Sequence, residues 1–463
     1  MFDLVVRGGS IVDARGERRA DLAIADGAIK AVAAPGEGIT GRQVVDATDK
    51  IILPGLVDAH VHIPGYLLSH RFDDFRSATS AAAVGGVTTV MLMPTDDPRT
   101  ATARYFARKR QLGEAHSFVD FAIQALIGPR TECAEIAAMA GQGAVSFELF
   151  LAYGGNPGFI VGHDDFELHR LLQLVKDVDG TAGITPHSPS LIARLTEQQR
   201  ELQQLRELEP RRNGNDPPPV QIFAATRPTL SEGLGIARAC TVAAETGTRI
   251  HLRALSSQRS IDMMCRFRDG VRLSSEVMSH HLMFSEEDAA GLGPYGVIVP
   301  PLRNQSERAS LRTAVRAGEI DMVVSDHSPV LREDKENGWA DIWRTPPGMA
   351  GLQTLCASML ALVDEGVLSL PDVVRACAER PAASFGLHPR KGALQVGSDA
   401  DFIVLDPSEP TLIDDAGQLS KASYTTMKGR TIGSRIECVY LRGNLVAEHG
   451  RIVGAPAGRF VRP

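Results

Sequence analysis

The feature that most constrains the fold is the alternation of short apolar runs with stretches of helical character along residues 54–389. The apolar runs include 88–93, 121–125, 249–252 and 322–325. Strands that alternate with helices indicate parallel βα units, and about 330 residues suit an eight-unit barrel with insertions. We therefore predict an α/β fold, a (β/α)8 TIM barrel, over residues 54–389.

The two ends of the chain show a different pattern. Residues 2–53 contain brief β-rich runs separated by Gly8-Gly9 and Asp26-Gly27, which are hairpin signals. A similar two-residue alternation returns in 401–407 and 437–453. The pattern predicts a small β-sandwich domain formed by residues 1–53 together with 390–463.

Composition limits the partners and the compartment. The net charge is −7, with 49 basic and 56 acidic residues well mixed, so we expect no nucleic-acid partner. No apolar run is long enough to span a membrane, and the six cysteines lack paired or metal-type spacing. We expect a cytoplasmic protein with reduced thiols and no membrane partner.

Residues 195–220 interrupt the alternation. Leu195, Leu202, Leu205 and Leu208 lie on a charged helical stretch that a Pro-, Gly- and Asn-rich run follows. The composition favours a solvated helix and a surface loop, and the alternatives are a lid over the site or a subunit contact.

A pair of histidines follows the first β-rich segment. His60 and His62 flank Val61, and residues i and i+2 of a strand point to the same side. At the carboxyl end of a barrel strand that side is the active-site mouth, where two imidazoles can share a metal. A polar strand face produces the same spacing by chance.

Two later polar residues also close apolar runs. Asp326 ends the run 323–325, where it can bind a metal and accept a proton from activated water, or cap the next helix. His187, in GITPHSPS, is either a ligand or a loop histidine bonded to backbone. Glu148 is an acid within the apolar run 145–152, an unusual place for a charge.

Taken in order, several segments resemble the amidohydrolase superfamily, in its cyclic-amide branch of dihydropyrimidinases, hydantoinases, allantoinases and dihydroorotases. The resemblance covers nearly the whole chain. It is carried by GLVDAHVHIPG, SFELFLAYGG, MSHHLMFSEEDA and GEIDMVVSDHSP, among others.

The resemblance implies two divalent metals, held by the histidine pair, a bridging carboxylated lysine, two further histidines and an aspartate. Four ligand positions match: His60, His62, His187 and Asp326. Glu148 stands where the family has the lysine, and Ala254 stands where it has a histidine. Glutamate is shorter than the modified lysine by roughly 3.5 Å, so it can supply a carboxylate to one metal but hardly bridge two.

We therefore predict one metal per chain, with Zn²⁺ favoured and Mn²⁺ or another divalent ion as alternatives. The predicted ligands are His60, His62, Glu148 and Asp326, while His187 orients substrate or holds a weak second metal. Tyr153 matches a tyrosine that stabilises the oxyanion in the family, although an aromatic residue capping the strand explains it as well.

Arg253, beside Ala254, is a candidate substrate-binding residue. If a strand bulge turned it inward, it would instead pair with Glu148. That pairing would accompany a non-hydrolytic, metal-free paralogue that serves as a binding or scaffold protein.

The resemblance implies a hydrolase that opens a cyclic amide or imide and is hydantoinase-, dihydropyrimidinase- or allantoinase-like. Asp326 and Tyr153 are the predicted catalytic residues. Dihydroorotate is disfavoured because the run 63–66 lacks the arginine that dihydroorotases carry there. The family's habit predicts a homodimer or homotetramer, and the small cyclic amide is the expected partner.

Overall fold

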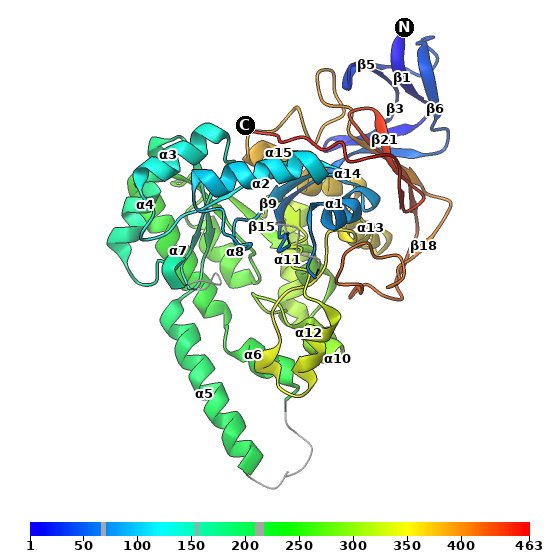
Figure 1. Cartoon of the computed structure of the whole chain (residues 1–463). Coiled ribbons are helices and arrows are strands. Elements are labelled where there is room, and N and C mark those ends of the chain that lie inside the picture. Colours follow the sequence, from blue (N-terminus) through cyan, green and yellow to red (C-terminus); the bar gives the residue numbers. More distant parts are fainter. Residues whose placement is uncertain (66–70, 153–156, 209–216) are drawn as a thin grey trace.

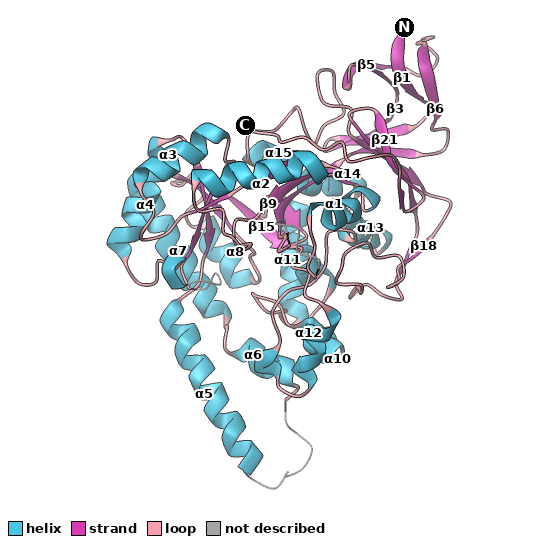
Figure 2. Cartoon of the chain, viewed as in Figure 1, coloured by secondary structure: helices cyan, strands magenta, loops and turns pink. Residues whose placement is uncertain are grey.

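The structure is a computed structural model, which describes residues 1–65, 71–152, 157–208 and 217–463. It has two parts: a body in which helices surround strands, and a β-rich part that contains the N-terminus (Figures 1 and 2). Among the described residues, no helix combines the length and apolar character needed to cross a bilayer.

The strands of the body form a parallel barrel. Consecutive strands pair in parallel, apart from a break between β10 and β11. The barrel closes where Val61, at the end of the first strand, forms a bridge with His327, just after the last strand. The strands are β8 (Leu56–Val61), β9 (Val87–Leu92), β10 (Asp120–Ile123), β11 (Ala125–Leu126), β12 (Phe147–Phe150), β13 (Thr181–Thr185), β14 (Arg249–Leu252), β15 (Leu273–Met278) and β16 (Met322–Val324). The predicted TIM barrel is confirmed.

The longer helices of the body cover the outside of the barrel because they bury an apolar face against the strands. In α4, for example, Leu168, Leu171 and Leu172 are fully buried. The helices are α1 (Phe75–Val84), α2 (Ala103–His116), α3 (Cys133–Gln142), α4 (Asp165–Asp177), α6 (Pro219–Ala225), α7 (Thr229–Thr246), α8 (Gln258–Cys265), α9 (Ser279–Met283), α10 (Glu286–Leu292), α11 (Gln305–Ala317), α12 (Arg332–Glu336), α13 (Leu355–Asp364), α14 (Leu370–Val374) and α15 (Arg380–Ser384).

The β-rich part is built from both ends of the chain. β17 of the C-terminal segment pairs with β7 of the N-terminal segment, and an apolar cluster that includes Leu22 and Phe402 joins the two sheets. One sheet has the order β5-β4-β1-β6 and the other β22-β21-β20-β17-β7-β2-β3. Their bounds are β1 (Phe2–Arg7), β2 (Ser10–Asp13), β3 (Gly16–Arg19), β4 (Asp21–Ala25), β5 (Ala28–Ala33), β6 (Gly41–Asp46), β7 (Ile51–Pro54), β17 (Phe402–Asp406), β20 (Arg435–Leu441), β21 (Asn444–Glu448) and β22 (Arg451–Ile452), with a separate pair β18 (Thr411–Leu412) and β19 (Thr431–Ile432). The domain boundaries at 53/54 and 389/390 stay a prediction.

Helix α5 (Pro189–Leu208) projects away from the barrel (Figure 1). It contains the start of the segment expected to be a solvated helix, and Leu202 on it is 44% exposed. The Trp343 indole donates to Gln203 Oε1 at 2.7 Å, which ties the helix to the loop after α12. Its role as a lid or a subunit contact stays a prediction.

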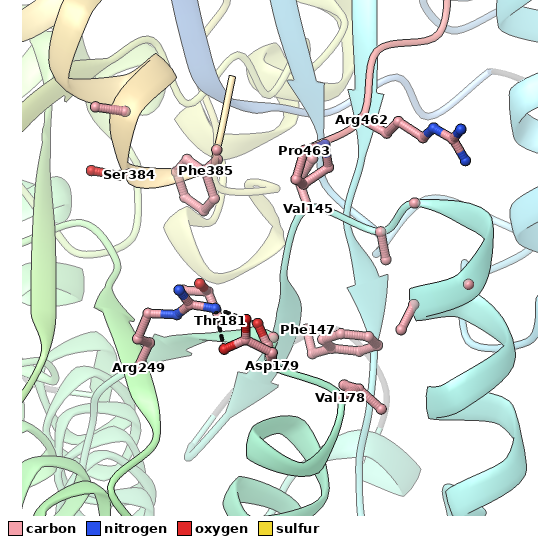
Figure 3. A pocket seen from close by; sticks show the side chains of 17 residues that line it. Val145, Phe147, Val178, Asp179, Thr181, Arg249, Ser384, Phe385, Arg462 and Pro463 are labelled. Atoms are coloured by element: carbon pink, nitrogen blue, oxygen red, sulfur yellow. Dashed lines mark hydrogen bonds and ion pairs between the residues drawn. The ribbon is translucent and has the colours of Figure 1, made fainter. Parts of the chain in front are cut away.

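A cavity of about 570 Å³ lies at the amino-terminal ends of the barrel strands (Figure 3). Phe147, Thr181 and Arg249, the first residues of β12, β13 and β14, line it. Arg249 pairs there with Asp179 at 2.8 Å. His60, His62 and Asp326 lie at the carboxyl-terminal ends of their strands, at the other end of the barrel, so this cavity is separate from the place where these three meet.

Candidate active site

Three of the predicted ligands meet at the carboxyl ends of β8 and β16. His60 lies in β8, His62 directly follows it, and Asp326 comes two residues after β16. Asp326 Oδ1 is 3.1 Å from His60 Nε2 and 3.3 Å from His62 Nε2. Asp326 has a positive φ of 42°, an uncommon backbone conformation that a surrounding structure must hold.

This arrangement fits a divalent cation. The three donor atoms all lie within 4.8 Å of one another, and they are two imidazole nitrogens and one carboxylate oxygen. Zn²⁺ accepts this donor set, and three protein ligands leave a coordination position for water or substrate in catalytic sites.

The histidines and the carboxylates of this site each favour the charged form of the other. Burial lowers the pKa of His60, but the Asp326 and Glu276 carboxylates outweigh burial and raise it to about 9. Burial raises the pKa of Asp326, but the two histidines outweigh it, so the pKa lies below its usual value. Asp326 is therefore ionised at neutral pH, as a cation ligand must be.

The other ring nitrogen of each histidine is also engaged. His60 Nδ1 lies 2.5 Å from Glu276 Oε1, and His62 Nδ1 lies 3.0 Å from Thr95 Oγ1. Partners of this kind fix the ring orientation and the tautomer of a histidine. Both Nε2 atoms are thus presented toward Asp326.

Arg253 points into the barrel on the same side as His251, two residues before it, and both side chains contact Glu276 Oε2. The next residue, Ala254, has a positive φ of 52°. Its guanidinium donates to Glu148 Oε2 and Oε1 at 2.9 and 2.7 Å, to Glu276 Oε2 at 2.8 Å, to the Ala59 carbonyl at 3.1 Å and to Gln124 Oε1. An arginine has five N–H donors, and these five bonds use all of them. This arrangement favours a structural role for Arg253 over the predicted contact with substrate.

Glu148 lies in β12 with both carboxylate oxygens on Arg253, and Ser146 Oγ also donates to Oε1 at 2.6 Å. The neighbouring strand makes room for it: a Cβ added at Gly183 would lie 2.2 Å from each carboxylate oxygen. The alternative in which Arg253 turns inward and pairs with Glu148 is thus the observed arrangement. Glu148 lies outside the group formed by His60, His62 and Asp326.

Glu276 was missed by the reasoning from sequence. It lies in the middle of β15, fully buried, and joins His60 to the Arg253 cluster. A signal was present, because Glu276 is an acid directly before the apolar pair Val277 and Met278, but the two serines before it make this run less apolar than the run around Glu148. Glu276 corresponds to none of the ligand positions that the family resemblance implies.

His187 follows β13 and is also buried, but it lies apart from the three clustered residues. Burial, together with the positive charges of Arg303 and Arg227, lowers the pKa of His187 to about 3. The neighbourhood of His187 is therefore cationic and disfavours a second metal ion. Tyr153, the predicted oxyanion donor, lies outside the described residues.

A second acidic group is already neutralised. Among the described residues, Asp120, Asp399 and Asp401 also place three oxygens close together. Lys391 Nζ lies among them, 2.8 Å from Asp399 and 2.7 Å from Asp401. This group joins the barrel to the β-rich domain and is no candidate metal centre.

The fold and the site fit one class of protein: barrel enzymes that hold a divalent cation at the barrel mouth with a His-x-His pair and a distant aspartate. The model of the Amidohydrolase family matches residues 220–446. An L-hydantoinase from Paenarthrobacter aurescens is 32% identical over 464 residues, covering 100% of this chain and 98% of the relative. An allantoinase from Rubrobacter xylanophilus is 33% identical over 470 residues, again covering 100% and 98%.

The solved structures agree. That of an L-hydantoinase (dihydropyrimidinase) from Arthrobacter aurescens superposes with a TM-score of 0.92 at 31% identity, covering 100% of both chains. The chain belongs to the amidohydrolase family, whose members use divalent metals, and it is an enzyme of the hydrolase class.

Proposed function

We propose that this enzyme opens the ring of a cyclic amide or imide by hydrolysis of a C–N bond, in the manner of a hydantoinase, dihydropyrimidinase or allantoinase. The observation that carries the proposal is the close approach of His60, His62 and Asp326 at the barrel mouth. The relatives that match over the full chain bear the names of such hydrolases.

We propose that these three residues hold one Zn²⁺ per chain, with Mn²⁺ as an alternative. When bound, the ion acidifies a water molecule and polarises the ring carbonyl. Asp326, ionised and 14% exposed at its side chain, accepts the proton and returns it to the leaving nitrogen. Tyr153 is proposed to donate a hydrogen bond to the developing oxyanion.

Glu148 and His187 take other roles in this proposal. Glu148 serves as the counterion of Arg253 rather than as a fourth ligand, because Arg253 donates to both of its carboxylate oxygens. His187 stays neutral and orients substrate. The relatives are hydrolases and nothing in the comparisons supports the non-hydrolytic alternative, although the ion pair that accompanied it is present.

The proposal extends to a cytoplasmic homodimer or homotetramer. All six cysteines are free thiols, which suits a reducing compartment. Size-exclusion chromatography with light scattering measures the subunit number directly.

The test is an ultraviolet hydrolysis assay of the purified protein with dihydrouracil, hydantoins, allantoin and cyclic imides, with Zn²⁺ or Mn²⁺ added. We expect turnover of at least one ring and its loss in His62→Ala. This variant removes a ligand whose side chain is 20% exposed and has no direct bond to Glu276, so the fold is kept. Absence of turnover with every substrate and both metals would contradict the proposal.

A further inference from the structure

Glu276 links the candidate metal site to the buried ion pair beneath it. Its Oε1 lies 2.5 Å from His60 Nδ1, and its Oε2 accepts from Arg253 at 2.8 Å. His251 Nε2 lies 2.9 Å from the same Oε2. The Glu276 side chain has no exposed surface, so water does not compete for these contacts.

The contact with His60 determines which ring nitrogen faces the metal. A carboxylate oxygen at 2.5 Å requires a proton on Nδ1, because two acceptors cannot approach so closely. The lone pair of a neutral His60 is then on Nε2, which is the atom 3.1 Å from Asp326. The opposite tautomer would place a proton where the ion binds.

The carboxylate of Glu276 is itself held in place. Arg253 and His251 anchor Oε2 from β14, so the carboxylate cannot rotate away from His60 without breaking two buried bonds. Arg253 in turn is held by both oxygens of Glu148 on β12. Two barrel strands thus fix the position of one carboxylate.

We propose that Glu276 is a positioning residue that fixes the orientation and tautomer of His60 and thereby sets the affinity of the site for its metal ion. The inference rests on the proposed function, because it takes His60 as a ligand. It assigns a role to a residue that neither closes a strand nor contacts the ion. Partners of metal-bound histidines typically change metal affinity about 10- to 100-fold.

The test is a zinc titration of metal-stripped protein in competition with a chromogenic chelator. We expect Glu276→Ala to raise the zinc dissociation constant about 10- to 100-fold. Glu276→Gln, whose amide oxygen still accepts from Nδ1–H, should recover much of the affinity. Glu276→Leu, which fills the site but accepts no hydrogen bond, replaces the alanine variant if that variant does not fold, and it should lose affinity to the same extent.

Lys391→Met is the matched control. It also breaks a fully buried ionic cluster, with Asp120 and Asp401, but it does not contact His60. We expect it to lower thermal stability and to leave zinc affinity unchanged.

A folded Glu276→Ala or Glu276→Leu variant whose zinc affinity equals that of the wild type would overturn the inference while leaving the proposed function intact. If the wild type itself bound no zinc or other divalent ion, both would fail.

Discussion

Arg253 donates to both carboxylate oxygens of Glu148, at 2.9 and 2.7 Å, and neither side chain is more than 1% exposed. The Glu148 carboxylate, which we predicted from the sequence as a metal ligand, is therefore neutralised by Arg253 inside the protein. Because the pair is bidentate and buried, it fixes β12 and β14 relative to each other. The candidate metal site at the barrel mouth then consists of the three residues His60, His62 and Asp326.

Removing the guanidinium should destabilise the fold. Arg253→Ala leaves Glu148 and Glu276 buried without their cation, and breaking a buried pair in this way costs about 3–5 kcal/mol. Urea unfolding of the metal-free protein measures the loss.

Arg249→Ala, on the same strand, is the control for that experiment. Its partner Asp179 is 88% exposed, so the free energy of unfolding should change by less than about 1 kcal/mol. Equal losses in the free energy of unfolding of Arg253→Ala and Arg249→Ala would show that the buried pair stabilises the fold no more than the exposed one.

The space beside Glu148 should tolerate no methyl group. In Gly183→Ala the new Cβ would lie 2.2 Å from each carboxylate oxygen, and Arg253 prevents the carboxylate from moving aside. We expect a loss of about 1–3 kcal/mol of stability. Gly141→Ala in α3, where no atom lies within 4 Å of the new Cβ, should be neutral or slightly stabilising. Comparable thermal unfolding of both variants would contradict the tight packing.

Asp326→Asn should remove activity. The variant loses both an anionic donor and the proton acceptor, so kcat/KM should fall by about 10²- to 10⁴-fold or more even with excess zinc. Asp179→Asn, an exposed carboxylate far from the site, is the control and should retain full turnover. An Asp326→Asn variant within about threefold of wild type would exclude Asp326 as the proton acceptor.

Acid should destabilise the protein through its buried histidines. Burial, with the charge of Arg303, lowers the pKa of His281 to about 3, whereas an unfolded chain protonates this histidine near 6.5. Between these values the unfolded state binds the extra proton, so stability falls as the pH falls. From about pH 7 to about pH 5 the loss from this residue is about 2 kcal/mol.

His281→Gln tests whether His281 causes this fall in stability, because glutamine does not take up a proton. It can still donate to the Pro301 carbonyl, which His281 Nε2 contacts at 3.2 Å. Urea unfolding at the two pH values should show that the variant loses less stability on acidification than the wild type. Parallel losses would mean that His281 is already protonated in the folded chain.

The barrel and the composite β domain could be predicted because their signals are periodic and local. The run 249–252 matches β14 residue for residue, and Gly8-Gly9 and Asp26-Gly27 separate strands as expected. The edge strands β3 and β6 were not recognised. Their residues are largely exposed and polar, so they show no apolar alternation.

The site could be predicted only in part. His60, His62 and Asp326 each close a strand, and parallel strands bring such residues together without further information. Arg253 lies two residues after His251, so strand alternation places both side chains on one side, where both contact Glu276 Oε2. Because the strand period places Arg253 and Ala254 on opposite faces, the sequence did not decide which of the two faces inward, and it left the partner of Glu148 open.

The most direct measurement is the metal content of protein purified without chelator and then dialysed against Zn²⁺, measured by elemental analysis. We expect about one zinc per chain, unchanged in Glu148→Gln and lost in His62→Ala. About two ions per chain, or an ion lost with Glu148→Gln in a folded protein, would contradict a one-metal site in which Glu148 serves Arg253.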